Sequence, residues 1–314
     1  MFDRARSALL AFAGVEIDPR LELVQRTLWP GRTSALSQIT SGITNANVKV
    51  EIDGEAFVVR LPGANTELLG IDRHAELEAT RAAADAGVCP EVVAFVEGCL
   101  VTRFVEGDPI PMADLQREEV LKKVVPSIRA IHDCPPIPSS FPVFRIVERY
   151  RDLAQEHGVP IPPVYERAHH LANRIHGSFT RNPMPSKTCH NDLLNANFLL
   201  DGDHVWIVDY EYAGMGDPLF DLGNLSINNS LSDEAQELLL ELYFGEVTDA
   251  RRARLKLMRI MSDFREAMWG VVQQGLSTLD IDYVGYAQKH FDRLSTTMAD
   301  PRFDDWLEAA GSPV

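Results

Sequence analysis

The sequence predicts a two-lobed α+β fold, with a small antiparallel-sheet lobe in residues 1–105 and a larger, mainly helical lobe in residues 106–314. Alternating apolar residues and turn signals are concentrated in the first third of the chain, whereas helical spacing dominates after the Gly107–Pro111 segment. A length of 314 residues suits two compact lobes. We expect the functional site to lie between them.

The first lobe begins with a predicted β-hairpin. Residues 46–52 alternate, Asp53-Gly54 is a strong two-residue turn signal, and residues 56–61 form the second strand. An alanine-rich stretch with helical spacing follows at 71–86, and Gly87 supplies its C-cap. Two more short strands are expected near 91–96 and 100–104, so this lobe should contain a sheet and one helix.

The second lobe reads as a series of helices around one embedded hairpin. Residues 198–200 and 204–208 form its strands, joined by the turn Asp201-Gly202-Asp203. The predicted helices cover residues 113–132, 144–156, 163–179, 233–243, 249–274 and 282–297.

Composition excludes several classes of protein. The chain has 30 Lys and Arg against 46 Asp and Glu, a net charge of −16, which argues against a nucleic-acid partner. No apolar run approaches the roughly 20 residues needed to span a bilayer, so no membrane insertion is expected. The four cysteines include no Cys-x-x-Cys pair, and we interpret them as reduced thiols of a cytoplasmic protein. The apolar residues 8–13 are interpreted as an N-terminal helix rather than a signal peptide.

The most informative stretch is the loop before the embedded hairpin. Residues 190–197 have the spacing His-x-Asp-x-x-x-x-Asn, and Asp209 ends the second strand of the hairpin. Strand pairing brings the two ends of a tight hairpin together. We therefore expect Asp192, Asn197 and Asp209 to converge on one patch.

Three such side chains fit a phosphoryl-transfer site. Mg²⁺ prefers oxygen ligands, which Asn197 and Asp209 supply, and leaves other positions for the phosphates of ATP. Asp192 can orient the attacking hydroxyl and accept its proton. Each residue alone would be read as a turn or strand-end residue. Their combined spacing matches the catalytic loop of protein kinases and favours catalysis.

Several segments together resemble the choline/ethanolamine kinase family, in the aminoglycoside-phosphotransferase-like branch of the kinase fold. The resemblance covers about residues 38–295 and rests on residues 42–45, 190–197, 207–212, 220–224 and 268–273. It implies a protein-kinase-like bilobal fold and an enzyme that uses ATP and Mg²⁺. The acceptor it implies is a small cationic alcohol.

The resemblance also implies a nucleotide site. Gly42, Thr44 and Asn45 stand where the family's phosphate-covering turn lies. Arg60 stands where protein kinases place a lysine, and a guanidinium there can clamp phosphates and pair with a helix carboxylate. Glu76 is the expected partner and Glu78 the alternative.

Other positions follow from the same comparison. Arg103 and Val105 are expected to contact adenine through their backbone, in a segment that resembles the hinge between kinase lobes. His190 is expected to support the catalytic loop by packing and backbone hydrogen bonding. Asp221 is expected to be buried and to brace the same loop.

The acceptor site departs from the family pattern. Tyr212 and Trp269 occupy positions that line the family's choline pocket, and a quaternary ammonium needs such aromatic faces. Glu211 is expected to support the metal or the cation. Glu266 replaces a second tryptophan of eukaryotic choline kinases, and Asn228 replaces a glutamate. Choline is the favoured acceptor and ethanolamine the next, while another amino alcohol stays open.

Rival interpretations remain at this stage. An aminoglycoside or thiamine kinase of the same branch would share the catalytic loop, although the Glu-Tyr after Asp209 and the late Trp-Gly-x-Val-Gln favour the amino-alcohol enzymes. A non-catalytic kinase-like binding module is disfavoured because all three catalytic positions are intact. A protein kinase would need an Ala-Pro-Glu segment after Asp209. The sequence carries no signal for an oligomeric state.

Overall fold

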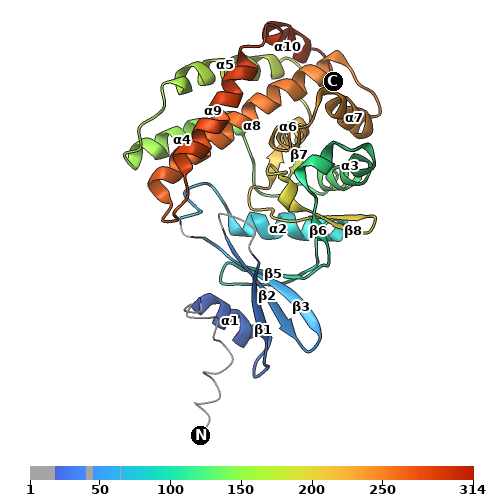
Figure 1. Cartoon of the computed structure of the whole chain (residues 1–314), viewed down its shortest axis with the longest axis vertical. Coiled ribbons are helices and arrows are strands. Elements are labelled where there is room, and N and C mark those ends of the chain that lie inside the picture. The colour runs from blue at the N-terminus through green and yellow to red at the C-terminus, as the bar shows by residue number, and fades with distance from the viewer. Residues whose placement is uncertain (1–17, 40–44, 64) are drawn as a thin grey trace.

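The computed structural model describes residues 18–39, 45–63 and 65–314. The helix expected at 8–13 and the predicted phosphate-binding residues Gly42 and Thr44 lie outside these ranges. The described chain forms an N-terminal antiparallel sheet and a larger helical part above it (Figure 1). The predicted fold class is confirmed.

The N-terminal sheet has five strands in the order β1-β2-β3-β5-β4. Antiparallel register places Val50 opposite Phe57 and Val59 opposite Val101, and all four side chains are buried. Helix α1 (Pro19–Leu28) adds Leu21 and Val24 to this core. The strands are β1 (Ala35–Ile39), β2 (Ala46–Ile52), β3 (Glu55–Leu61), β4 (Val92–Val96) and β5 (Cys99–Arg103).

Helix α2 (Arg73–Asp85) lies between the sheet and the helical part (Figure 1). The side chain of Asp72 caps its N-terminus by accepting hydrogen bonds from the backbone N–H groups of residues 74 and 75. Two of its buried alanines, Ala79 and Ala83, belong to the same hydrophobic core as the large lobe. The helix is therefore packed against both lobes.

The helical part is built around the long helix α8 (Asp249–Leu276), which packs against α4, α6, α9 and α10. None of the helices in the described residues is long and apolar enough to cross a membrane. The other elements of this part are η1 (Met112–Gln116), α3 (Glu118–His132), α4 (Val143–Glu156), α5 (Val164–Phe179), α6 (Pro218–Asn228), α7 (Asp233–Phe244), α9 (Tyr283–Met298) and α10 (Phe303–Ala310).

The helical part also contains short strands, on the side that faces the five-stranded sheet. The embedded hairpin pairs Phe198 with Ile207, so that the residues just before and just after it are neighbours. A further two-stranded sheet pairs residues 187–189, which come just before the catalytic loop, with residues 214–216, which come shortly after Tyr212. The strands are β6 (Asp108–Pro109), β7 (Lys187–Cys189), β8 (Phe198–Asp201), β9 (His204–Ile207) and β10 (Gly214–Gly216), with the 3₁₀ turn η2 (Asn195–Asn197).

Helix α6 was not predicted, although its start carries clear signals. Pro218 occupies the first turn, and the Asp217 side chain accepts a hydrogen bond from the Leu219 N–H. Gly223 lowers helix propensity in its interior. The glycine is needed because a Cβ there would lie 2.8 Å from the Cβ of Met258 on α8. Tertiary packing thus overrides the local preference. Helices α1 and α10 and strand β1 were also not predicted.

Candidate active site

A cavity of about 750 Å³ lies between the sheet and the helical part. Residues from β2, β3 and β5 line it on one side, and the catalytic loop and α8 line it on the other. The predicted site residues that line it are Arg60, Arg103, Val105, Asp192, Asn197, Asp209, Glu211, Tyr212, Glu266 and Trp269.

The catalytic loop and the hairpin bring Asp192, Asn197 and Asp209 to this one cavity, as expected. The Asn197 side-chain amide donates to the Asp192 carbonyl at 2.8 Å. The Val208 N–H donates to the Asn197 carbonyl at 3.0 Å. Asp209 itself has a left-handed backbone, with φ of 76°, which is uncommon for a residue other than glycine.

His190 holds the two sides of this arrangement together. Its Nε2 donates to the Val208 carbonyl at 3.0 Å, and its Nδ1 accepts from the Asp192 N–H at 3.2 Å. Burial lowers the pKa of His190, so the neutral imidazole that these contacts require is favoured. These are packing and backbone contacts of the kind expected for a supporting residue.

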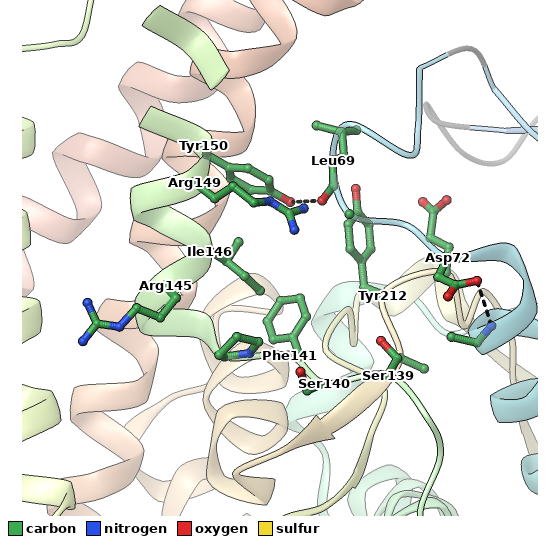
Figure 2. Close-up of a pocket in the computed structure, with 15 residues that line it drawn as sticks. Leu69, Asp72, Ser139, Ser140, Phe141, Arg145, Ile146, Arg149, Tyr150 and Tyr212 are labelled. Carbon is green, nitrogen blue, oxygen red and sulfur yellow. Dashed lines mark hydrogen bonds between the residues drawn. The ribbon is translucent and has the colours of Figure 1, made fainter. Parts of the chain in front are cut away.

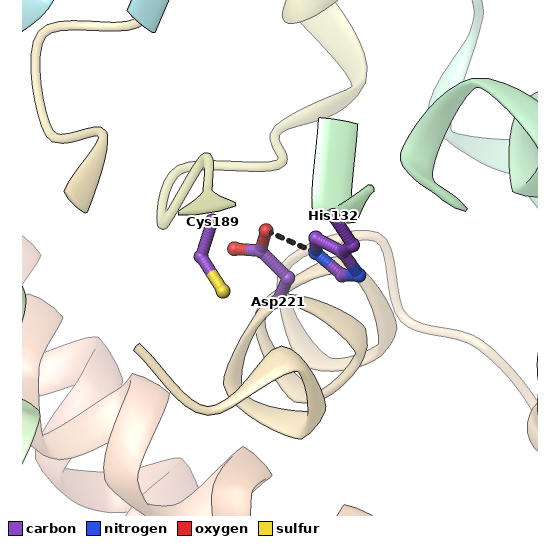
Figure 3. A group of neighbouring side chains, drawn as sticks. All are labelled: His132, Cys189 and Asp221. Atoms are coloured by element: carbon purple, nitrogen blue, oxygen red, sulfur yellow. Dashed lines mark hydrogen bonds and ion pairs between the residues drawn. The ribbon is translucent and has the colours of Figure 1, made fainter. Parts of the chain in front are cut away.

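Asp221 of α6 is fully buried beneath the loop. Its Oδ2 accepts from the His190 N–H at 2.8 Å and its Oδ1 from the Asn191 N–H at 2.6 Å. His132 and Cys189 lie beside it, close enough for the three residues to surround a metal ion (Figure 3). However, both carboxylate oxygens bind the loop, and His132 bonds Asp221 and Tyr243 through its two nitrogens. The group is therefore a hydrogen-bonded brace.

Two further side chains hold the loop, and our sequence analysis did not assign them. The Asn224 Oδ1 accepts from the Leu193 N–H at 2.6 Å. The Asn229 amide donates to the Leu193 carbonyl at 2.9 Å. Asn224 lies in the family-like segment 220–224, which was a usable signal, whereas Asn229 carried none. Together with Asp221 they fix the backbone on both sides of Asp192.

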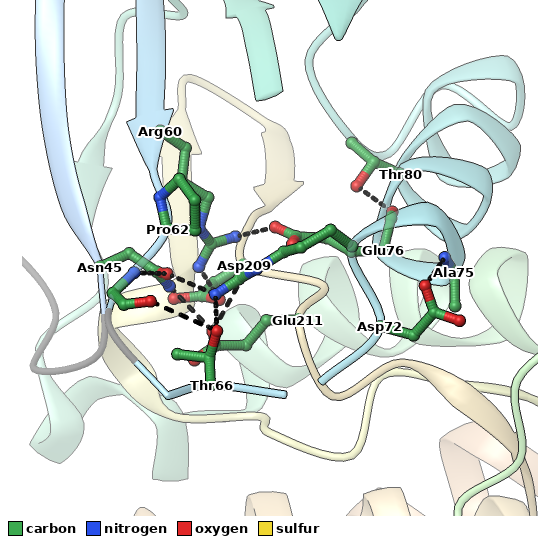
Figure 4. Close-up of polar contacts among 12 residues, drawn as sticks. Asn45, Arg60, Pro62, Thr66, Asp72, Ala75, Glu76, Thr80, Asp209 and Glu211 are labelled. Atoms are coloured by element: carbon green, nitrogen blue, oxygen red, sulfur yellow. Dashed lines mark hydrogen bonds and ion pairs between the residues drawn. The ribbon is translucent and has the colours of Figure 1, made fainter. Parts of the chain in front are cut away.

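Arg60 is buried between two carboxylates (Figure 4). One terminal nitrogen donates to Glu76 at 2.7 Å and the other contacts Asp209. The predicted pairing with Glu76 is confirmed. The alternative partner, Glu78, instead meets Arg81 at 3.1 Å on the surface.

A second arginine, Arg73, joins this network and was missed by sequence reasoning. It donates to Glu76 at 2.7 Å, to the Asn45 Oδ1 at 3.0 Å and to the Thr66 hydroxyl at 3.0 Å. The Asn45 amide donates in turn to Glu211 at 2.8 Å. The loop before β2 is thereby linked to the segment after the embedded hairpin. An i,i+3 relation between Arg73 and Glu76 was the available signal.

The pKa values of the buried carboxylates in the site are shifted in different directions. Burial would raise the pKa of Asp209, but the Arg60 guanidinium outweighs it and holds that pKa below the ordinary value. Burial, reinforced by the Asp209 charge, raises the pKa of Glu211 to about 7. Burial also raises the pKa of Asp192, against the opposing effect of Arg265. A bound cation would favour the ionised forms.

The donor set suits Mg²⁺. Asn197 and Asp209 present amide and carboxylate oxygens at the cavity, and Glu211 lies beside them. The Asn197 amide nitrogen is committed to the Asp192 carbonyl, which leaves its Oδ1 for a cation. Hard oxygen donors of this kind, together with phosphate oxygens, match the coordination that Mg²⁺ adopts in kinases.

The far end of the cavity is apolar and lies along β5 and the segment after it. Leu100, Val105 and Leu199 are among its lining residues. The Arg103 N–H already donates to the Glu91 carbonyl at 2.9 Å, so of its two backbone groups the carbonyl is the one that could make the contact expected from the sequence. Among the described residues, the Val105 N–H has no backbone partner.

The opposite end of the cavity is aromatic and charged. The Trp269 indole N–H donates to the Tyr212 hydroxyl at 2.9 Å, and Tyr286 of α9 packs edge-on against Trp269. Both oxygens of Glu266 are occupied, one by Arg265 and the other by the Tyr286 hydroxyl at 2.7 Å. Glu266 is therefore already neutralised within the protein. Arg265 and Tyr286 were not assigned a role from sequence.

Asn228 does not line this cavity. Its Oδ1 accepts from Arg293 at 3.3 Å, beneath helix α9. A smaller cavity of about 110 Å³ shares Glu211 and Tyr212 with the large one (Figure 2). Its remaining walls come from the loop after β3, residues 139–142 and helix α4.

The sequence of residues 35–257 matches the model of the phosphotransferase enzyme family. LicA of Haemophilus influenzae is 27% identical over 248 residues, which cover 74% of this chain and 72% of that protein. Human ethanolamine kinase 2 is 26% identical over 329 residues, covering 92% of this chain and 84% of that protein.

A comparison with solved structures points to the same family. A choline/ethanolamine kinase family protein from Mesorhizobium loti superposes with a TM-score of 0.81 at 30% identity, covering 93% of this chain and 98% of that one. The fold and the site define a phosphotransferase with a kinase-like architecture. Within that class, the chain belongs to the choline/ethanolamine kinase family.

Proposed function

We propose that this protein transfers the γ-phosphoryl group of ATP to the hydroxyl of a small amino alcohol, with choline and ethanolamine as the first candidates. The observation that supports this most strongly is the convergence of Asp192, Asn197 and Asp209 at one cavity. That cavity is apolar along β5 and aromatic at α8, as separate nucleotide and acceptor ends require. We place the reaction in the cytoplasm, where ATP is supplied.

We assign the roles of the site residues as follows, with their geometry as support. Asp192 accepts the proton of the acceptor hydroxyl as its oxygen forms a bond to the γ-phosphorus, while the bond from that phosphorus to the β–γ bridging oxygen breaks and ADP leaves. Mg²⁺, held by Asn197 and Asp209, would neutralise charge on the phosphates. Arg60 binds phosphate oxygens and Glu76 orients its guanidinium. Catalysis is then mostly positioning and charge stabilisation.

The nucleotide end supports ATP as the donor. The Val105 N–H and the Arg103 carbonyl lie on the edge of an apolar cavity wall and can pair with adenine through the backbone alone. Asn45 lies at the loop between β1 and β2 and is linked to Glu211 and Arg73. A phosphate at this loop would therefore meet two arginines, Arg60 and Arg73.

The test is release of ADP with Mg²⁺ and ATP against choline, ethanolamine, thiamine and kanamycin in parallel. We expect turnover of an amino alcohol that is lost in Asp192→Asn. The matched control is Asp201→Asn, at the exposed end of strand β8, which should behave like wild type. Turnover of kanamycin or thiamine alone, or unchanged activity in Asp192→Asn, would overturn the proposal.

A further inference from the structure

Arg265 occupies the acceptor end of the cavity with a charge of its own. Its side chain is only 2% exposed, yet it lines the cavity beside Asp192. The guanidinium carbon lies 4.2 Å from the centre of the Tyr212 ring, over its face. Charge and aromatic face are at the separation typical of a cation–π contact.

The guanidinium is fixed from several directions. Its Nη1 donates to Glu266 at 2.5 Å and lies 3.5 Å from the Asp192 carboxylate. Phe141 lies on the same group at 5.8 Å. The Nε and Nη2 atoms have no hydrogen-bond partner among the described residues, so the ring contacts and Glu266 hold the group in place. Burial would lower the pKa of Arg265, but the charges of Glu266 and Asp192 outweigh it and raise that pKa, so Arg265 stays charged.

This arrangement conflicts with a quaternary ammonium at the same place. Such a group has no N–H donors and depends on aromatic faces and an unpaired carboxylate. In this cavity, Arg265 covers one face of the Tyr212 ring, and both oxygens of Glu266 are already bonded.

A primary ammonium has different requirements. It is smaller and carries three N–H donors, so it can bind carboxylate and hydroxyl oxygens without an aromatic face. Asp192 and Glu211 present such oxygens at the cavity: the Glu211 Oε2 already accepts from Asn45 at 2.8 Å, whereas its Oε1 has no hydrogen-bond partner among the described residues. We propose that Arg265 is a specificity-determining residue: it fills the position of a quaternary ammonium against Tyr212 and makes the site select primary amino alcohols. This inference rests on the proposed function and narrows its acceptor class.

The test compares ethanolamine with choline in wild type and in Arg265→Met, which keeps an unbranched apolar chain but removes the charge. Steady-state kcat/KM with Mg²⁺ and ATP is measured for both acceptors, and calorimetry gives their dissociation constants. We expect wild type to favour ethanolamine by about tenfold or more, and Arg265→Met to shift the ratio about tenfold toward choline. Arg265→Lys keeps the charge and should keep the preference.

Arg252→Met is the matched control, because Arg252 lies on the same helix but is exposed and pairs with Glu237. Its acceptor ratio should equal that of wild type. If Arg265→Met does not fold, the wild-type ratio still decides: choline binding as tight as ethanolamine overturns the inference. If wild type turns over neither acceptor, the proposed function fails, and the calorimetric ratio tests Arg265 separately. An unchanged ratio in folded Arg265→Met also overturns it.

Discussion

Arg60 donates a hydrogen bond of 2.7 Å to Glu76, and this contact joins strand β3 to helix α2 in the wall of the active site. Glu76 also accepts from Arg73 at 2.7 Å, so one buried carboxylate pairs with two guanidinium groups, that of the buried Arg60 and that of the partly buried Arg73. An arginine left without such a partner in a buried site is costly. We therefore expect a change in this pair to affect both stability and ATP binding.

Glu76→Gln should lower the free energy of unfolding by about 3 kcal/mol or more, because it removes one of the two carboxylates paired with Arg60 and the nearer of the two paired with Arg73. We also expect KM for ATP to rise about tenfold, since Arg60 loses its orientation. Glu78→Gln is the matched control on the same helix and should change stability by less than about 0.5 kcal/mol. Urea unfolding and ATP titrations check both effects. Equal behaviour of the two variants would contradict the assigned pairing.

Asp209→Ala should abolish turnover almost completely, by about a hundredfold or more in kcat, because the variant lacks the carboxylate that we propose as a metal ligand. The fold should persist, since Arg60 keeps Glu76 and the loop brace around Asp221 is untouched. Asp203→Ala, at the exposed tip of the same hairpin, is the control. Activity and melting temperature are measured together. Wild-type activity in Asp209→Ala would exclude the metal assignment.

The stability of the protein should depend on His190 at mildly acidic pH. Its pKa is lowered in the folded state by burial, so the unfolded chain binds a proton first as pH falls below about 6.5. The contribution of His190 is therefore present above that pH and is lost on acidification. Urea unfolding between about pH 5 and 7.5, without Mg²⁺, should show a flatter profile for His190→Gln. The exposed His204→Gln controls for loss of one histidine, and a wild-type slope in His190→Gln would contradict this prediction.

Gly270→Ala should disturb the acceptor end. A Cβ at Gly270 would lie 2.8 Å from the Tyr286 ring and 3.1 Å from the Ala287 nitrogen, so α8 and α9 would have to separate. We expect a loss of about 1–3 kcal/mol in stability and a raised acceptor KM. Gly177→Ala in α5 has nothing within 4 Å and should instead stabilise the protein slightly. A neutral Gly270→Ala would show that the helices are not closely packed there.

The sequence correctly predicted helices with a strong hydrophobic periodicity and a site whose residues are close together in the chain. Helices such as α8 and α9 were placed to within two residues, and the hairpin argument correctly brought Asp192, Asn197 and Asp209 together. These features depend on neighbours in the chain. Phosphate and metal roles of the same residues remain predictions for the experiments above.

Features that depend on distant contacts were not predictable in the same way. Arg73 reads as an ordinary charge in the first turn of a helix, and only its approach to Asn45 and Glu211 gives it a role. Arg265 lies close in sequence to Glu266 and Trp269, which were assigned to the acceptor site. Its own role depends on stacking on Tyr212, which is 53 residues away in the chain (265 − 212). Asn228 fitted the family position and yet bonds Arg293 outside the cavity.

The shared packing of helix α2 bears on how the cleft would open. Its alanines lie in the core of the large lobe, whereas the five-stranded sheet has a separate core with α1. A hinge motion confined to the chain connection near residue 105 would separate α2 from the core of the large lobe. We therefore expect the sheet and α1 to slide over α2 as one unit, a shear motion with Arg60 and Glu76 as its sliding contact. The rate of nucleotide exchange would then depend on how readily the ion pair between Arg60 and Glu76 breaks.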